Sequence, residues 1–124
     1  MSATVKEVAA LADISKFFKD TGADSTSGEC HNALTWLAIQ IKKAGISDYN
    51  IHLCTGVFAR YDHSWIQIEN IDTEEHTIID MTVDQFGESN EKAYIGPVSP
   101  AYVIHNAVLL SDQDNISDFI CNLG

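Results

Sequence analysis

Ser64-Trp-Ile-Gln-Ile-Glu69 and Thr77-Ile-Ile-Asp-Met81 are the two stretches that decide the fold. Ile66 and Ile68 alternate with other residues in the first stretch, which is typical of a strand with one buried face. The second stretch is short and rich in β-branched residues, which also favours a strand. Because the segment Asn70–Glu75 between them is polar, we expect a turn there and an antiparallel hairpin.

Further strands are predicted on both sides of this hairpin. Residues 51–58 predict a strand that is broken at Gly56, and residues 102–110 predict another after a loop containing two prolines. Residues 112–123 fit either a terminal helix or a short tail.

Helical periodicity precedes the strands. It predicts one helix over Thr4–Phe18, a polar loop over Asp20–Glu29 and a second helix over Cys30–Lys43, followed by Gly45 as a C-terminal cap. The second helix has one apolar face, made of Ala33, Leu34, Leu37, Ala38 and Ile41. Helices packed on an antiparallel sheet predict an α+β fold, and a chain of 124 residues predicts one domain over 1–124.

The charge balance excludes two classes of partner. Eighteen acidic and seven basic side chains give a formal net charge of −11, which repels phosphate backbones and anionic lipid. No apolar run is long enough to span a bilayer, and the first residues lack the pattern of a signal peptide. We therefore expect a cytoplasmic protein with no nucleic-acid or membrane partner; delivery as a bacterial or phage effector is the alternative for so small and acidic a chain.

The three cysteines are Cys30, Cys54 and Cys121. An odd number without a CxxC pair does not fit a disulfide framework or a zinc finger. We expect reduced thiols, with Cys54 and Cys121 as small buried apolar residues. We also expect no cofactor and no metal ion.

Cys30 has the position that a thiol nucleophile requires. It begins the second predicted helix, and a helix N-terminus favours the thiolate because unpaired N–H groups and the helix dipole stabilise negative charge. His31 lies about 100° around the helix from Cys30. We therefore expect His31 at the surface and not in the role of base.

His63 and Asp80 are the candidate base and orienting carboxylate. Folding the hairpin symmetrically about the bond between Ile71 and Asp72 pairs Ser64 with Ile79 and places His63 opposite Asp80. In that arrangement Asp80 accepts a hydrogen bond from one ring nitrogen, and the other nitrogen takes the thiol proton. A buried thiol, a surface histidine and a turn aspartate are the structural alternatives for these three residues.

The same residues resemble the papain-like and transglutaminase-like cysteine enzymes. Three segments carry the resemblance: Gly28-Glu-Cys30 before a helix, Asp62-His-Ser-Trp-Ile66, and Ile78-Ile-Asp-Met-Thr-Val-Asp-Gln-Phe86. The similarity spans about half of the chain. It implies a minimal papain-like or transglutaminase-like core with Cys30 as nucleophile, His63 as general base and acid, and Asp80 as orienter.

The resemblance implies an enzyme but leaves its reaction open. It fits a thiol-dependent hydrolase, either a peptidase or a protein-glutamine deamidase, that acts on an amide of a protein or peptide through a thioester. An acyl or amine transferase and a non-catalytic protein-binding module are the alternatives. The chain departs from the papain pattern because no glutamine precedes Cys30, so the second oxyanion donor is unassigned.

Overall fold

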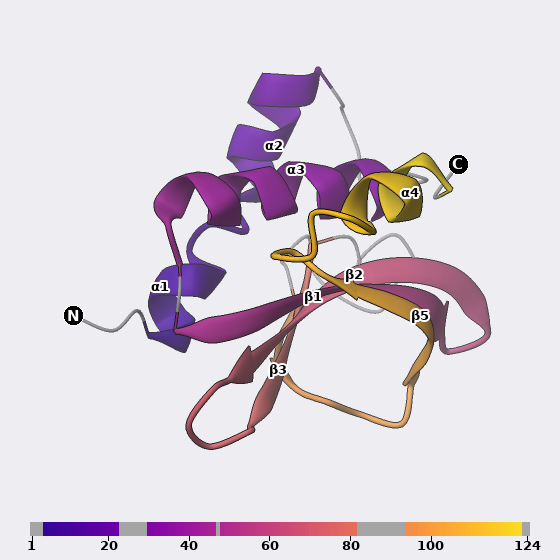
Figure 1. Ribbon diagram of the computed structural model, residues 1–124. Coiled ribbons are helices and arrows are strands. Elements are labelled where there is room, and N and C mark those ends of the chain that lie inside the picture. Colours follow the sequence, from indigo (N-terminus) through magenta and orange to yellow (C-terminus); the bar gives the residue numbers. More distant parts are fainter. Residues whose placement is uncertain (1–3, 23–29, 47, 82–93, 123–124) are drawn as a thin grey trace.

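The protein is described by a computed structural model that covers residues 4–22, 30–46, 48–81 and 94–122, with only the backbone of Cys30 included. It has an α+β fold in which helices cover one face of a five-stranded antiparallel sheet (Figure 1). The helices are α1 (Val5–Ala9), α2 (Ile14–Thr21), α3 (Cys30–Ala44) and α4 (Ile116–Cys121). The strands are β1 (Tyr49–Phe58), β2 (Tyr61–Asn70), β3 (His76–Asp80), β4 (Tyr94–Pro97) and β5 (Tyr102–Leu109).

The α+β class and the helix α3 are confirmed, whereas the first predicted helix is wrong. Residues 4–18 form two short helices, because the Asp13 side chain accepts a hydrogen bond from the Lys16 backbone N–H and caps a new helix. The predicted apolar face of α3 is buried against the sheet. Gly45 ends α3 in the left-handed conformation (φ 68°), as a C-terminal cap requires.

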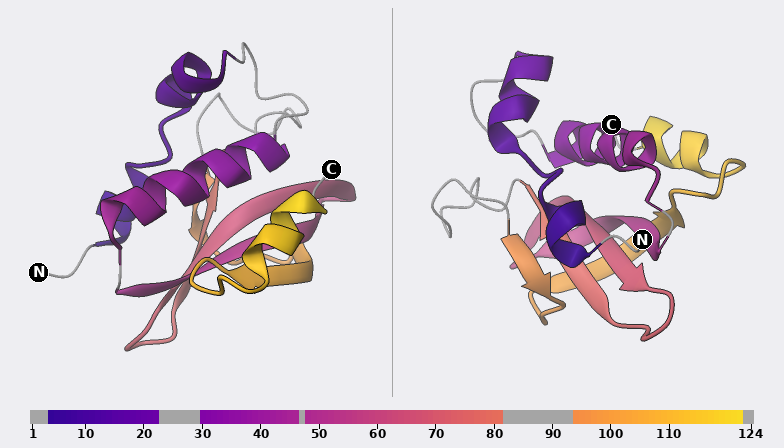
Figure 2. Two further views of the ribbon diagram at one scale, coloured as in Figure 1. Left: turned by 45° about the horizontal axis from the view of Figure 1, so that its top comes forward. Right: turned by 90° about the vertical axis from the view of Figure 1, so that its left-hand side faces the viewer.

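The strand order β4-β3-β2-β1-β5 places β4 and β5 at opposite edges, although only residues 98–101 connect them. The sheet is therefore strongly curved, and Figure 2 shows this from two sides. The curvature brings the rings of Tyr94 and Tyr102 to 5.8 Å between centroids, in a stacked arrangement. The sequence missed β4 because Gly96 and Pro97 predict a loop, yet an edge strand tolerates proline.

Each face of the sheet has its own apolar core. The helix face buries α3 residues against Leu53, Ile66, Ile68, Ile79 and Val108. The opposite face encloses a smaller cluster of Cys54, Phe58, Trp65, Ile78 and Tyr102. A β-strand alternates its side chains between faces, so successive residues of β2 belong to different cores.

The sequence predicted a break in the strand at Gly56, but β1 continues through this residue and only its pairing with β5 shifts register there. A Cβ atom at this position would lie 1.9 Å from the carbonyl oxygen of Val103. Only glycine permits so close an approach of two backbones. Gly56 also pairs with His63 on the other side of β1, so this close approach occurs beside a candidate site residue.

The hairpin of β2 and β3 has a different register from the predicted one. Ile79 pairs with Ile66 and not with Ser64, which is a shift of two residues. The cause is the turn, because the Asn70 side chain accepts hydrogen bonds from the backbone N–H groups of Asp72 and Thr73. These bonds centre the turn between Asp72 and Thr73, one residue later than the predicted centre between Ile71 and Asp72.

Among the described residues, no helix is both long and apolar enough to cross a bilayer.

Candidate active site

His63 and Asp80 are in direct contact inside the protein, as the sequence predicted. Nε2 of His63 lies 2.7 Å from Oδ2 of Asp80, and the two residues are 1% and 0% exposed. Asp80 therefore orients the imidazole and holds the proton on Nε2 when the ring is neutral. Nδ1 is the ring nitrogen that does not face Asp80, so proton exchange with a reacting group would go through Nδ1.

The observed register explains why His63 and Asp80 are in contact although the hairpin is shifted by two residues from the predicted pairing. If the observed pairing of Ile66 with Ile79 is continued by one residue, Asp80 lies opposite Trp65. His63 is then the diagonal neighbour of Asp80, two residues along β2 on the same face. A diagonal pair of this kind is within reach of long side chains such as histidine.

Tyr102 is a site residue that the sequence analysis did not find. Its hydroxyl donates a hydrogen bond of 2.8 Å to Oδ2 of Asp80, the same oxygen that faces His63. It comes from the edge strand β5, which the curvature of the sheet brings across the second core. No local pattern could have indicated it, because the contact depends on how far the sheet bends.

Aromatic rings surround the His63–Asp80 pair. The ring of His63 lies 5.9 Å from Phe58 and 6.1 Å from Trp65, measured between centroids, and the Trp65 ring is stacked on it. Tyr102 contacts both Phe58 and Trp65. These apolar walls exclude water, and a hydrogen bond to a carboxylate is stronger in such surroundings. The position of Trp65 fits both shielding of the His63–Asp80 pair from water and packing in the second core.

Cys30 is the first residue of α3, as predicted. The position of its side chain lies outside the described part of the structure, and so does the distance from its sulfur to His63. The neighbouring residue His31 is described; it lines the same pocket as His63, and the charge of His63 lowers the pKa of His31. The start of α3 and the candidate base therefore adjoin.

His31 is not the plain surface residue that helical geometry predicted. It is half-buried, and its Nδ1 lies 2.7 Å from Oγ of Ser64, which is 2% exposed. Burial lowers the pKa of His31 most, the charge of His63 lowers it further, and Asp62 acts in the opposite direction. His31 is therefore neutral at pH 7.

A pocket of about 320 Å³ lies where α3 begins. Its walls come from α3, β1, β2, β5 and α4, and its lining residues are His31, Thr55, Gly56, Asp62, His63, His105, Asn106, Phe119 and Asn122. Polar side chains predominate, which suits a substrate with hydrogen-bonding groups such as an amide.

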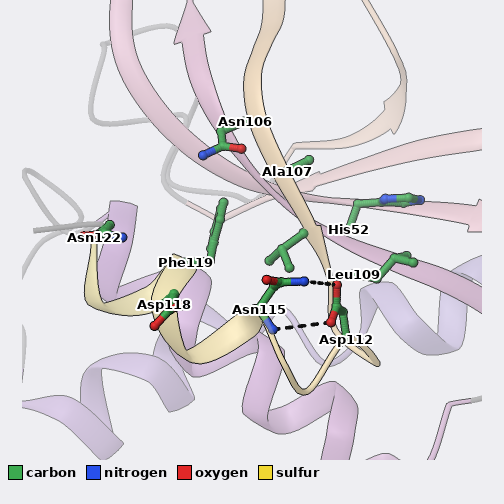
Figure 3. Close-up of a pocket in the computed structure, with 10 residues that line it drawn as sticks. His52, Asn106, Ala107, Leu109, Asp112, Asn115, Asp118, Phe119 and Asn122 are labelled. Atoms are coloured by element: carbon green, nitrogen blue, oxygen red, sulfur yellow. Dashed lines mark hydrogen bonds between the residues drawn. The ribbon is translucent and has the colours of Figure 1, made fainter.

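A second pocket, of about 510 Å³, adjoins the first between β5 and α4 (Figure 3). The two pockets share Asn106, Phe119 and Asn122. Asp112 and Asp118 add carboxylates to the second pocket, and Asn115 donates a hydrogen bond of 2.9 Å to Asp112. The shared residues make the two pockets one polar, acidic surface that begins beside His63.

The other cysteines have opposite environments. Cys54 is buried as predicted, and burial raises the pKa of its thiol to about 12. Cys121 is exposed, so the prediction that it is buried is wrong. It lies in the short helix α4, whose described residues are all at least partly exposed.

Two further histidines, His52 and His76, lie away from the candidate site. His52 and His76 flank Glu69 on the other end of the sheet, with Nε2 atoms 3.3 and 3.6 Å from its carboxylate oxygens. Within the described ranges, no three His, Cys, Asp or Glu side chains are arranged to hold a metal ion.

Comparison of the chain with protein-family models, with curated proteins and with solved structures gave no match in any of the three.

Proposed function

We propose that the protein is a thiol-dependent hydrolase with a minimal papain-like or transglutaminase-like core. It acts on an amide of a protein or peptide, as a cysteine peptidase or protein-glutamine deamidase. The observation that carries the proposal is the buried His63–Asp80 pair beside the first turn of a helix that begins with a cysteine. A cysteine, a histidine and a carboxylate in these relative positions form a nucleophile, a base and an orienter.

The reaction assigns one step to each residue. The thiolate of Cys30 attacks the amide carbon and forms a C–S bond, while His63 gives a proton to the leaving nitrogen as the C–N bond breaks. The product that leaves is ammonia from a primary amide or an amine from a peptide bond. Water then attacks the thioester, His63 takes a proton from the water, and the C–S bond breaks to return the cysteine and release a carboxylic acid.

The pockets support a peptide or protein substrate. The pocket beside His63 continues into a larger one along β5 and α4, which gives room for more than a single side chain. The net charge of −11, together with Asp62, Asp112 and Asp118 in the pocket walls, favours a neutral or basic segment over an acidic one.

Iodoacetamide labelling at different pH values tests the nucleophile. An activated Cys30 should be alkylated at about pH 6, where a free thiol with a pKa of about 8.5 reacts slowly. His63→Ala should shift the labelling curve upward by about one pH unit or more, since the thiolate loses its imidazolium partner. Cys54 and Cys121 in the same sample are internal references for a buried and an exposed thiol. A Cys30 that titrates like Cys121 in both proteins would refute the proposal.

Product analysis then identifies the reaction. The protein is incubated with basic and acidic glutamine-containing peptides, with and without a primary amine, and the products are identified by mass spectrometry. Hydrolysis releases ammonia or cleaves the chain, and the amine is not incorporated. Incorporation of the amine would instead indicate a transferase. Turnover that survives in Cys30→Ser would exclude thiol catalysis, and an activated Cys30 without any turnover is the outcome expected of a binding module.

A further inference from the structure

One hydrogen bond connects the sequence neighbours of the two principal candidate residues. His31 follows Cys30 at the start of α3, and Ser64 follows His63 in β2. Nδ1 of His31 and Oγ of Ser64 are 2.7 Å apart. A bond between these two side chains therefore joins the first turn of the helix to the strand that carries the base.

The first turn of a helix needs such an anchor. Its backbone N–H groups have no partners within the helix, so the end unwinds more easily than the middle. Further along α3, apolar residues such as Ala33 and Leu34 pack against the sheet, and these contacts are not directional. The His31–Ser64 bond adds a directional contact in the first turn, and Ser64 is buried, so water competes little for it.

The electrostatics of His31 are compatible with a role as an anchor. Both burial and the charge of His63 keep His31 neutral, and Asp62 does not reverse this direction. A neutral ring can either accept the Ser64 hydroxyl proton at Nδ1 or donate its own, and the hydroxyl rotates to suit either tautomer. The bond therefore persists whether or not His63 is protonated.

We infer that His31 and Ser64 are a pair of positioning residues that hold the Cys30 end of α3 against the part of β2 that carries His63. The inference rests on the proposed function, because it requires Cys30 and His63 to act together. Ser64 projects to the helix face of β2, whereas His63 projects to the opposite face with Asp80. The pair thus controls the position of the helix without contacting the His63–Asp80 bond.

A double-mutant cycle tests the inference, with the alkylation rate of Cys30 as the readout. Ser64→Ala removes one oxygen atom, and His31→Leu removes the ring. Each should slow alkylation at about pH 6 by about five-fold, which corresponds to one hydrogen bond of about 1 kcal/mol, and should shift the pH profile upward. In the double variant the alkylation rate of Cys30 should fall no further than in either single variant, since both substitutions remove the same hydrogen bond. His31→Asn, which places an amide near the position of Nδ1, should restore part of the rate.

His76→Leu is the matched control. His76 also bonds through Nδ1 to a β2 side chain, Gln67 Nε2 at 2.9 Å, but at the other end of the hairpin. Its loss should leave alkylation of Cys30 unchanged. Hydrogen–deuterium exchange gives a second readout. The backbone amides of Leu34 and Thr35, which bond to carbonyl groups of the first turn of α3, should exchange faster in Ser64→Ala and remain protected in His76→Leu.

The outcomes separate this inference from the proposed function. If wild-type Cys30 is not activated, the proposed function fails. If Cys30 is activated and both single variants retain the wild-type pH profile while folded, the positioning role is overturned. A loss in His31→Leu that is a hundred-fold larger than in Ser64→Ala would also overturn it, because His31 would then act on the reacting groups directly.

Discussion

Replacement of Asp80 by alanine tests the buried pair independently of any enzymatic activity. Oδ2 of Asp80 faces two buried donors, Nε2 of His63 at 2.7 Å and the Tyr102 hydroxyl at 2.8 Å. In Asp80→Ala both donors lose this acceptor within an aromatic enclosure. A buried donor without an acceptor costs about 1–3 kcal/mol, so the free energy of unfolding should fall by about 4 kcal/mol. Tyr102→Phe removes one donor together with its bond and should cost only about 1–2 kcal/mol.

The double variant Asp80→Ala/Tyr102→Phe gives the sharper result. Because phenylalanine has no hydroxyl, the double variant removes the Asp80 acceptor together with one of the two donors that bond to it, whereas Asp80→Ala displaces both donors. It should therefore be no less stable than Asp80→Ala, and by the same reasoning about 1 kcal/mol more stable. Simple addition of the two single losses would instead make it the least stable protein of the set.

Urea unfolding followed by tryptophan fluorescence measures these differences. A domain of this size is stable by about 5–15 kcal/mol, so a loss of about 4 kcal/mol is large but leaves folded protein to measure. A loss below about 1 kcal/mol in Asp80→Ala, or additive losses in the double variant, would show that water replaces the carboxylate. The enclosed geometry on which the orienting role depends would then be wrong.

Three further predictions test other parts of the structure. Gly56→Ala should lower the free energy of unfolding by about 3 kcal/mol in urea titrations, because the new Cβ would lie 1.9 Å from the backbone of β5. In native protein at about pH 8.5, Cys121 should be alkylated while Cys54, whose pKa burial raises to about 12, reacts only after unfolding; mass spectrometry of the labelled peptides distinguishes them. The Trp36 indole N–H, at 3.1 Å, is the main cause that lowers the pKa of Asp20. The stability that this bond contributes is therefore present above about pH 4 and is lost as the pH falls through the lowered pKa of Asp20. In urea titrations, Asp20→Asn should weaken the fall in the free energy of unfolding over this acidic range.

Periodicity predicted the elements whose apolar residues recur at regular spacing along one face. Leu34, Leu37 and Ile41 recur at helical spacing and pack on the sheet, and Ile66 and Ile68 alternate along β2 and pack under the helices. Burial of one face imposes these spacings on any sequence that folds this way. Such elements can be recognised from a single sequence because the signal repeats several times within them.

The first helix and the hairpin register were predicted wrongly because each depends on a single polar side chain. One side chain, Asp13, divides the predicted first helix by capping α2, and one side chain, Asn70, shifts the hairpin register by two residues. Aspartate and asparagine are also common at positions where they neither cap a helix nor shape a turn, so their presence alone does not predict these contacts. The contacts of Tyr102 with Asp80 and of His31 with Ser64 join segments that are 22 and 33 residues apart, and no local pattern records them.

The contact between His63 and Asp80 nevertheless survived the wrong register, and the pleat of the strand explains why. Side chains alternate between faces with a period of two, so a shift of two residues leaves Asp80 on the same face as His63 and moves it only from a direct to a diagonal position. A shift of one residue would have moved Asp80 to the helix face, on the side of Ile66, and separated the pair. The candidate pair therefore requires that any shift of the hairpin register be an even number of residues, and its exact alignment matters less. Insertion or deletion of a single residue in the turn between β2 and β3 should abolish the His63–Asp80 contact while preserving the strand.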